Sequence, residues 1–298
     1  MTEAPSLRTL VSDRGRRLAA AGIQPDEARL DAELLARHVL GWDRATFIVN
    51  EAGPVLPGFE RAYATLCERR ERREPMAYIL GRCEFWGLEF DVTPAVLIPR
   101  PETEQIVEEA LARYAGTGGP DRILDVGTGS GCLAVTLARE FPRARVVATD
   151  LSQEALAVAS RNARRHGVER RVAFAEGSLF APVEGLFDLI VSNPPYVPEH
   201  DREILQPEIR DHEPALALFA GPDGLEAIRP MVALARGHLR WEGWLIFEFG
   251  FGQADAVTAL IAASGPWDDV ALVPDLQGIP RTATLRCPAP AAVARASP

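Results

Sequence analysis

The sequence predicts an α/β fold in which helices cover both faces of a mainly parallel sheet, preceded by a small helical domain. Three observations predict it. From residue 105 to residue 286, short apolar runs of strand length alternate with runs of helix length. Before residue 85, apolar residues recur mainly at helical spacing. Two of the expected strands lead directly into a glycine-rich and a proline-rich loop, at the strand ends where such sheets bind ligands.

Residues 1–82 are expected to form a helical bundle. Pro25 suits the first turn of a helix, and Asp26 and Glu27 favour the positive end of its dipole. Another helix begins near Phe59 and runs into the segment ERRERRE (68–74). Glutamates alternate with arginines in that segment, so we expect a solvated, self-compensating helix face and not a nucleic-acid-binding patch.

Residues 83–104 contain aromatic and β-branched residues interrupted by glycine and proline, which predicts a β-hairpin that links two domains. Residues 105–287 form the second domain, and the Pro/Ala-rich residues 288–298 are expected to be a flexible tail. The expected strands cover residues 122–126, 145–149, 171–175, 186–192, 244–249 and 282–286; the expected helices cover 133–140, 152–165, 224–239 and 253–263.

The composition excludes several chemistries. All 32 basic residues are arginine, so a Schiff-base lysine, a pyridoxal-phosphate site and a P-loop lysine are impossible. Residues 1–85 hold equal numbers of arginines and acids, so the net charge of −10 falls on residues 86–298 and argues against nonspecific nucleic-acid binding.

The apolar and cysteine content indicates a protein of the reducing cytoplasm. The first residues carry charges where a signal peptide is apolar, and no apolar run reaches the roughly 18 residues of a membrane span. The four cysteines form no CxxC pair, and we expect them to be free thiols. We therefore expect a cytoplasmic protein with no membrane contact.

A glycine loop follows the first expected strand of the second domain. In DVGTGSG (125–131), the glycines allow a sharp turn and a close approach to a ligand, and the next helix points unpaired N–H groups at that ligand. Asp150 ends the second strand, where an acid accepts hydrogen bonds from a ribose diol. Cys132 stands where a dinucleotide fingerprint needs glycine or alanine. The spacing GxGxG resembles motif I of class I S-adenosylmethionine methyltransferases.

The fourth strand ends in Asn193-Pro194-Pro195-Tyr196. The prolines fix the backbone and remove two N–H donors. The Asn193 side-chain carbonyl, the Pro194 backbone carbonyl and the Tyr196 ring then offer acceptors and an aromatic wall. Two carbonyls that accept the hydrogens of a planar NH₂ would orient it and favour charge developing on its nitrogen during transfer. A rigid turn is the alternative interpretation of this tetrapeptide.

Other catalytic centres have no support in the sequence. The histidines are scattered, and His212-Glu213 lacks the second histidine of HExxH. No GxSxG nucleophile motif is present. We therefore expect no metal site and no covalent enzyme intermediate.

Further segments narrow the choice among proteins that contain NPPY. They are PMAYILGRCEFWGLEF (75–90), LIPRPETE (97–104), DHEPALALFAGPDGLE (211–226) and DLQGIPRTATLR (275–286). With these segments in this order, the chain resembles the peptide chain release factor N5-glutamine methyltransferases, the PrmC/HemK family, over about residues 10–286. The resemblance implies a Rossmann-like, seven-stranded methyltransferase domain and an N-terminal domain that binds the release factor.

The resemblance also implies an activity and a set of site residues. The activity is transfer of a methyl group from S-adenosyl-L-methionine, leaving S-adenosyl-L-homocysteine, to the amide nitrogen of the GGQ glutamine in bacterial class I release factors. We expect a monomer with no direct nucleic-acid contact. The expected donor site is Gly127, Thr128, Gly129, Ser130, Gly131, Asp150, Ser178, Leu179 and Asn193; the expected substrate site is Asn193, Pro194, Pro195 and Tyr196, of which Asn193, Pro194 and Tyr196 are catalytic.

Two details depart from or extend this pattern. Such enzymes often place an acid near the adenine after the third strand, where this chain has Ser178, so the serine hydroxyl would accept from the adenine amino group while Leu179 packs on the ring. Arg100 and Glu102, before the fold begins, are expected to line the site.

Three alternatives remain open at this point. A glutamine methyltransferase of a ribosomal protein would have the same residues at the substrate site. A DNA amino methyltransferase acting on adenine or cytosine would need a target-recognition domain and a basic groove, for which this chain offers a small neutral domain and an acidic one. A cofactor-binding module without catalysis would have no use for an intact NPPY segment.

Overall fold

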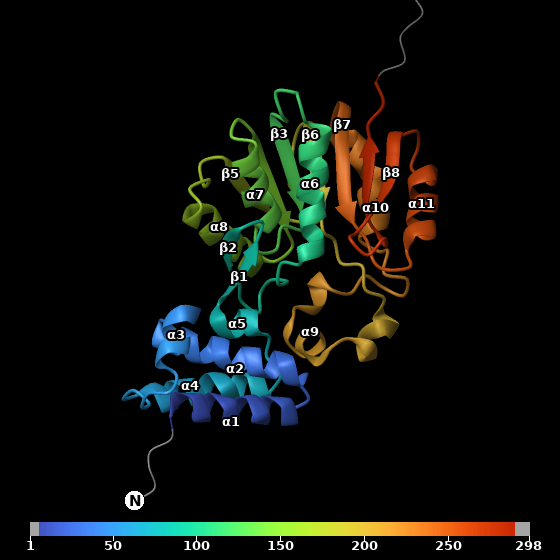
Figure 1. Ribbon diagram of the computed structural model, residues 1–298. Helices are drawn as coiled ribbons and strands as arrows, with labels where there is room; N and C mark the ends of the chain where they lie inside the picture. Colours follow the sequence, from blue (N-terminus) through green and yellow to red (C-terminus); the bar gives the residue numbers. More distant parts are fainter. Residues whose placement is uncertain (1–5, 290–298) are drawn as a thin grey trace, which may run out of the picture. The chain divides into compact units, whose positions relative to one another are not determined.

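The computed structural model describes residues 6–289 and divides into two compact units, each described here by itself (Figure 1). Unit 1 contains the chain up to Arg82 together with Gln206–His212, and unit 2 contains Cys83–Leu205 and the chain from Glu213 on. The ends, including residues 290–298 of the expected flexible tail, lie outside the described residues.

Unit 1 is helical, with helices that begin and end at residues suited to those positions. Ser6 caps the first helix by accepting a hydrogen bond from the Thr9 amide, and Pro25 opens the second, which Gly41 ends in the left-handed conformation. The helices are α1 (Leu7–Ala20), α2 (Pro25–Leu40), α3 (Arg44–Asn50), α4 (Phe59–Glu71), α5 (Met76–Leu80) and α9 (Pro207–His212).

The core of unit 1 consists of the apolar faces of these helices. Leu18, Leu35 and Tyr63 are buried in it, and the Tyr63 hydroxyl donates to the backbone oxygen of Ala32 at 3.0 Å. A buried tyrosine with a satisfied hydroxyl fixes how α4 lies against α2.

The arginine segment of α4 is not the solvated helix face that its local charge pattern predicts. The Arg70 side chain is buried, with 1% of the residue exposed. Its guanidinium donates to Asp31 at 2.7 Å, to Glu27 at 2.9 Å and to Glu208 of α9 at 2.7 Å. Arg73 donates to both oxygens of Glu208, at 2.6 and 2.7 Å. This prediction was wrong because most of the charge partners come from outside the segment.

Unit 2 begins at Cys83, within a β-hairpin of β1 (Arg82–Phe85) and β2 (Leu88–Asp91). Phe85 and Phe90 are buried in the core of unit 2, where their rings meet edge to face at 6.1 Å. The hairpin therefore packs as part of the α/β unit, in addition to carrying the chain into it.

A seven-stranded sheet forms the centre of unit 2, in the order β5-β4-β3-β6-β7-β9-β8. The pairs from β5 to β7 are parallel, and β9 is antiparallel to both β7 and β8. The strands are β3 (Arg122–Val126), β4 (Arg145–Asp150), β5 (Val172–Glu176), β6 (Phe187–Ser192), β7 (Leu239–Glu248), β8 (Asp268–Pro274) and β9 (Pro280–Arg286). The Rossmann-like, mainly parallel sheet predicted for this chain is confirmed.

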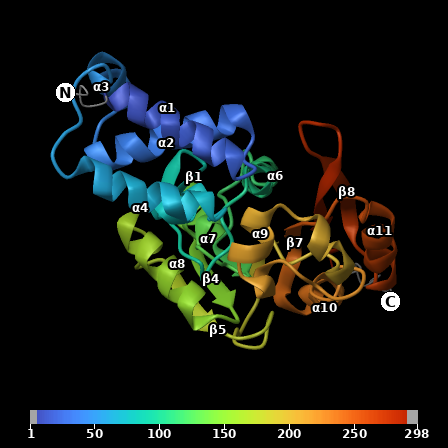
Figure 2. The same cartoon turned by 90° about the horizontal axis from the view of Figure 1, so that it is seen from below.

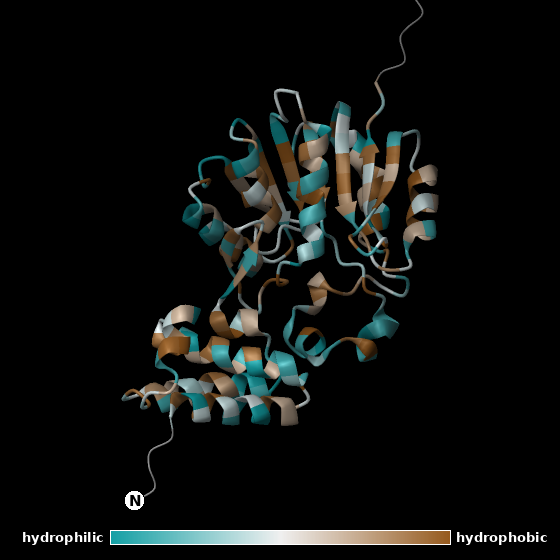
Figure 3. Ribbon diagram, in the orientation of Figure 1, coloured by the Kyte–Doolittle hydropathy of each residue, from teal (hydrophilic) through white to brown (hydrophobic). Residues whose placement is uncertain are grey.

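Helices cover both faces of this sheet, so its central strands are hydrophobic on both sides (Figure 3). Ile123 faces the core beneath α6, α7 and α8, while Leu124, the next residue, faces the core beneath α10 and α11, which lie side by side (Figure 2). The helices are α6 (Glu104–Arg113), α7 (Cys132–Glu140), α8 (Gln153–Arg165), α10 (Ile228–Ala235) and α11 (Ala254–Ala263).

Short 3₁₀ turns connect these elements, at Pro101–Thr103, Glu199–Ile204, Ala215–Ala217 and Arg236–His238. The helix expected over residues 224–239 is shorter than predicted, and β7 begins five positions before the expected 244. Strand β8 was not expected from the sequence.

The strand order reverses between β3 and β6. From β3 the chain moves outward to β4 and β5, then returns to β6 on the other side of β3. Val126 and Ser192 are paired at the ends of these two strands. The loops that follow them, beginning with Gly127 and Asn193, therefore start side by side at the position where open α/β sheets bind ligands.

Candidate active site

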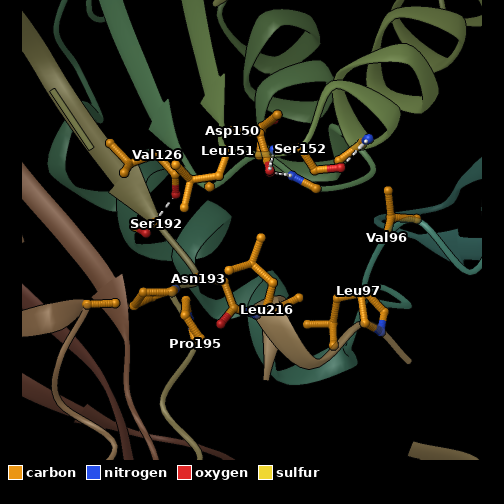
Figure 4. Close-up of a pocket in the computed structure, with 18 of the residues that line it drawn as sticks. Val96, Leu97, Val126, Asp150, Leu151, Ser152, Ser192, Asn193, Pro195 and Leu216 are labelled. Carbon is orange, nitrogen blue, oxygen red and sulfur yellow. Dashed lines mark hydrogen bonds between the residues drawn. The ribbon is translucent and has the colours of Figure 1, made fainter. Parts of the chain in front are cut away.

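A cavity of about 540 Å³ opens at this edge of the sheet (Figure 4). Asp150, Leu151 and Ser152 lie on one side of it, and Asn193 and Pro195 lie on another. The volume is within the range of small-molecule sites. Predicted site residues that line the cavity are Gly127, Thr128, Gly129, Ser130, Asp150, Ser178, Leu179, Asn193, Pro194 and Pro195.

The glycine loop needs its glycines for backbone conformation. Gly127, Gly129 and Gly131 have φ of 72°, 54° and 82°, in the left-handed region. A Cβ on Gly131 would lie 3.0 Å from the Cβ of Ala159 in α8. Gly131 does not line the cavity; its role here is to let α7 begin close against α8.

Asp125, at the start of this loop, holds it from beneath. One carboxylate oxygen accepts from the Thr128 hydroxyl at 2.6 Å and from the Ala134 amide at 3.1 Å. The other has no hydrogen-bond partner among the described residues. Burial raises the pKa of this carboxyl to about 7.

Asp150 joins the glycine loop to the end of β4. Its two oxygens accept from the Gly129 and Ser152 amides, both at 2.9 Å. Each carboxylate oxygen can accept more than one hydrogen bond. The side chain is thus fixed in place at the cavity wall and can still accept hydrogen bonds from a ligand there.

The end of β5 supplies a further part of the wall. Gly177, Ser178 and Leu179 line the cavity, and Leu179 has a φ of 48°, which is uncommon for a leucine. The Thr149 hydroxyl donates to the Leu179 backbone oxygen at 3.3 Å. Ser178 and Leu179 are therefore placed on the same cavity as Asp150.

Asn193 is held by a line of buried hydrogen bonds. Its amide nitrogen donates to the Thr103 hydroxyl at 2.8 Å, and that hydroxyl donates to Glu248 at 2.7 Å. The Tyr196 hydroxyl donates to the other oxygen of Glu248 at 2.8 Å. The Asn193 side-chain oxygen has no hydrogen-bond partner among residues 6–289.

Tyr196 does not form the aromatic wall of the cavity that the sequence predicts. It is not among the residues that line the cavity, and its ring packs with the core beneath α10 and α11. Its backbone oxygen accepts from Gln253 at 3.0 Å. Burial, with the Glu248 carboxylate beside it, raises the pKa of Tyr196 well above its usual value. In this structure the tyrosine supports Glu248.

Arg100 and Glu102 do not line the cavity either. The Arg100 guanidinium pairs with Glu213, which is buried and also accepts from the Ile98 amide at 3.1 Å. This pair holds the segment after the hairpin against the segment that begins at Glu213. Its neighbours Pro99 and Pro214 both line the cavity, so Arg100 helps to shape the wall from behind.

Two family models match this chain. The PrmC N-terminal domain matches residues 11–81, and the methyltransferase small domain matches residues 109–216. A release factor glutamine methyltransferase of Geobacter sulfurreducens is 47% identical over 94% of this chain and 98% of its own length. This chain belongs to the release factor glutamine methyltransferase family.

Another family member, from Cereibacter sphaeroides, is 43% identical over 97% of this chain and its whole length. A methyltransferase from Pyrococcus furiosus has a similar fold, with a TM-score of 0.51 at 21% identity, over 69% of this chain and 91% of that one. Family membership confirms the resemblance and the methyltransferase class, and it decides against a DNA amino methyltransferase and a module without catalysis.

Three residues that support the site were not identified from the sequence: Thr103, Glu248 and Asp125. Glu248 ends a strand at the ligand-binding edge, and Asp125 directly precedes the glycine loop, so their positions carried a usable signal. Thr103 carried no such signal, because its segment is irregular.

Within residues 6–289 there is no group of three or more His, Cys, Asp or Glu side chains placed to hold a metal. The helices described there are too short or too polar to span a membrane.

Proposed function

We propose that this chain transfers a methyl group from S-adenosyl-L-methionine to the N5 amide nitrogen of the glutamine in the GGQ motif of bacterial class I release factors. The observation that carries the proposal is the Asn193 side-chain oxygen, a buried acceptor without a partner among the described residues, on a cavity shared with the glycine loop and Asp150.

The donor site consists of Gly127–Gly131, Asp150, Ser178, Leu179 and Asn193. These residues suit a nucleoside, because the loop begins a helix and Asp150 retains acceptor capacity toward the cavity. When bound there, S-adenosyl-L-methionine would supply a methyl group on a sulfonium and leave as S-adenosyl-L-homocysteine. Asp150 would bind its ribose, Leu179 would pack on the adenine, and Ser178 would accept a hydrogen bond from the adenine amino group.

Asn193 and Pro194 bind the acceptor amide. An amide nitrogen is a weak nucleophile because its lone pair is delocalised. The Asn193 side-chain oxygen and the Pro194 backbone oxygen accept its two hydrogens, which orients the nitrogen and stabilises the positive charge that develops on it. After the methyl group has been transferred, the cationic nitrogen releases one of these protons to water, so no strong base is needed. Holding two reactants in register lowers the barrier by several kcal/mol, with about 7–11 kcal/mol as the upper range. Pro195 fixes the backbone between these groups and Tyr196.

The helical unit binds the release factor in this proposal. Residues 1–82 contain the whole match to the PrmC N-terminal domain, which supports a role beyond catalysis. The enzyme acts as a cytoplasmic monomer that contacts neither a membrane nor nucleic acid directly, in keeping with a net charge of −10.

The target is tested with purified enzyme, labelled S-adenosyl-L-methionine and a release factor that has either the native GGQ or a Gln→Ala change. Label is expected on the native protein alone. Equal label on both proteins, or label on neither, would refute the proposed target. Ribosomal proteins in a parallel reaction test the sister substrate, and labelling of these proteins in place of the release factor would contradict the proposal.

The role of Asn193 is tested with Asn193→Ala. Loss of one preorganised acceptor is expected to lower kcat by about 10²–10³-fold, as for a lost oxyanion-hole donor, while the Kd of the donor changes only a few-fold. Calorimetry gives the donor Kd, and steady-state kinetics give kcat. Equal losses in both would mean that Asn193 mainly holds the donor.

A further inference from the structure

We propose that Thr103 and Glu248 are positioning residues that decide which atom of the Asn193 amide faces the substrate. The proposal rests on the proposed function, because it concerns the orientation of the group that binds the acceptor amide.

The two residues reach Asn193 from separate elements. Thr103 ends the 3₁₀ turn before α6, and Glu248 is the last residue of β7. Ser192 pairs with Phe247 across β6 and β7, which brings Glu248 beside Asn193. Each of Thr103 and Glu248 is only 2% exposed. No solvent is available to exchange for these hydrogen bonds, so their directions must be satisfied internally.

The direction of each hydrogen bond follows from the inventory of donors. An ionised carboxylate only accepts, and each oxygen of Glu248 faces one hydroxyl, from Thr103 at 2.7 Å and from Tyr196 at 2.8 Å. The single hydrogen of the Thr103 hydroxyl is then used toward Glu248. Toward Asn193 the threonine oxygen can only accept, so the Asn193 nitrogen must lie on that side, at 2.8 Å.

The side-chain oxygen of Asn193 consequently remains free to accept a hydrogen bond from the substrate. It has no hydrogen-bond partner among the described residues, and Asn193 lines the cavity. An asparagine amide is nearly symmetric in shape, so without Thr103 and Glu248 it could rotate by half a turn at little steric cost. The rotated amide would present an NH₂ to the NH₂ of the substrate, donor against donor.

The same arrangement selects an amide over a carboxylate. Two oxygens, from Asn193 and Pro194, attract the NH₂ of glutamine and repel the carboxylate of glutamate. If the Asn193 amide turns, its NH₂ attracts a carboxylate. The ratio of affinities for glutamine and glutamate at the target position therefore reports the orientation of Asn193, independently of how fast methyl transfer is.

The pKa of Glu248 is raised above its usual value. Burial is the main cause and Glu102 adds to it, while the hydrogen bonds from Thr103 and Tyr196 and the charge of Arg281 oppose the rise. The hydroxyl donors thus favour the form of Glu248 that holds them in the productive direction.

The test compares Thr103→Val, Thr103→Ser and Glu248→Gln in the full-length enzyme. Valine keeps the shape of threonine without its hydroxyl, and serine keeps the hydroxyl. Thr103→Val is expected to lower kcat about 10–100-fold, as for a misplaced catalytic group, with the donor Kd within about twofold of wild type. Thr103→Ser is expected to retain kcat within about threefold.

The second measurement is competition binding between the native release factor and its Gln→Glu form. S-adenosyl-L-homocysteine replaces the methyl donor, so that neither protein is methylated during the measurement. Wild type is expected to bind the glutamine form more tightly. Thr103→Val and Glu248→Gln are expected to reduce that preference about tenfold. A merely structural role would weaken both forms equally and leave the ratio unchanged.

Two results would overturn the proposal. One is a Thr103→Val enzyme that keeps the wild-type preference for glutamine, whatever its kcat. The other is a Thr103→Ser enzyme as impaired as Thr103→Val, since side-chain volume and not the hydroxyl would then matter. Both are distinguishable from failure of the proposed function, in which wild-type enzyme itself does not discriminate GGQ from its Gln→Ala form.

Discussion

Replacing Arg70 by methionine removes the shared cation of a buried ionic cluster in unit 1. Arg70 binds Asp31, Glu27 and Glu208 at 2.7–2.9 Å. Methionine replaces the aliphatic part of the arginine side chain and lacks the guanidinium. Asp31, which is 5% exposed, then loses the cation that it binds, while Glu208 keeps Arg73. Breaking a buried pair by removing one partner costs about 3–5 kcal/mol, and we expect a loss of this size for unit 1.

The pKa of Glu208 reflects the same cluster. Burial alone raises this pKa, but the hydrogen bonds from Arg73 and Arg70 lower it from 4.5 to about 2. At about 1.4 kcal/mol for each pH unit, ionised Glu208 stabilises the fold by about 3 kcal/mol. Because the folded pKa is depressed, this stabilisation is present above about pH 4.5 and is lost as the pH falls toward 2.

The assay is urea unfolding at neutral pH followed by circular dichroism, with Arg72→Met as the matched control. Arg72 lies two positions along the same helix end but is exposed, so the control should change the free energy of unfolding by less than about 0.5 kcal/mol. The reasoning is refuted if Arg70→Met costs less than about 1 kcal/mol, or no more than Arg72→Met.

Two further predictions concern the glycine loop. Because the pKa of buried Asp125 is raised to about 7, the folded chain binds this proton more tightly than the unfolded chain, and the free energy of unfolding should fall by up to about 4 kcal/mol between about pH 4 and 7. A pH series of urea titrations should show this slope in wild type and its loss in Asp125→Asn; an unchanged slope would contradict the pKa assignment. Gly131→Ala combines a φ of 82° with a Cβ 3.0 Å from Ala159, whereas Gly167→Ala at a φ of 69° meets nothing within 4 Å. Gly131→Ala should therefore lower the free energy of unfolding by about 1–3 kcal/mol more than Gly167→Ala does, which a larger fall in Tm would show; equal falls in Tm would mean that α8 moves away without cost.

Local patterns were enough to predict the sheet and the loops that bear the site. The strands that end at Val126 and Ser192 are buried on both faces, so most of their residues in the sequence are apolar. Strand β8 has only the short apolar run of residues 270–273, between two aspartates and a proline, and its residues are all exposed or half-buried. It is an edge strand that depends on pairing with β9, so this short run was not recognised as a strand.

Contacts between distant positions account for most of what could not be predicted. Arg70 meets Glu208 across 138 positions, and Asn193 meets Thr103 across 90. Tyr196 was expected to face the cavity, but its hydroxyl pairs with Glu248, 52 positions later. The residue types and their spacing indicate which chemistry is possible at these sites. Which side chains form hydrogen bonds or ion pairs with one another depends on the three-dimensional fold.

The distance along the chain between Arg70 and Glu208 also sets an order of events during synthesis. At roughly 5–20 residues per second, the ribosome makes Arg70 about 7–28 s before Glu208, which lies 138 positions later. Helices α1 to α5 are complete long before α9 exists. Until then, Asp31 and Glu27 are the carboxylates of the cluster that can pair with Arg70. The ionic cluster closes only after the NPPY segment has been made.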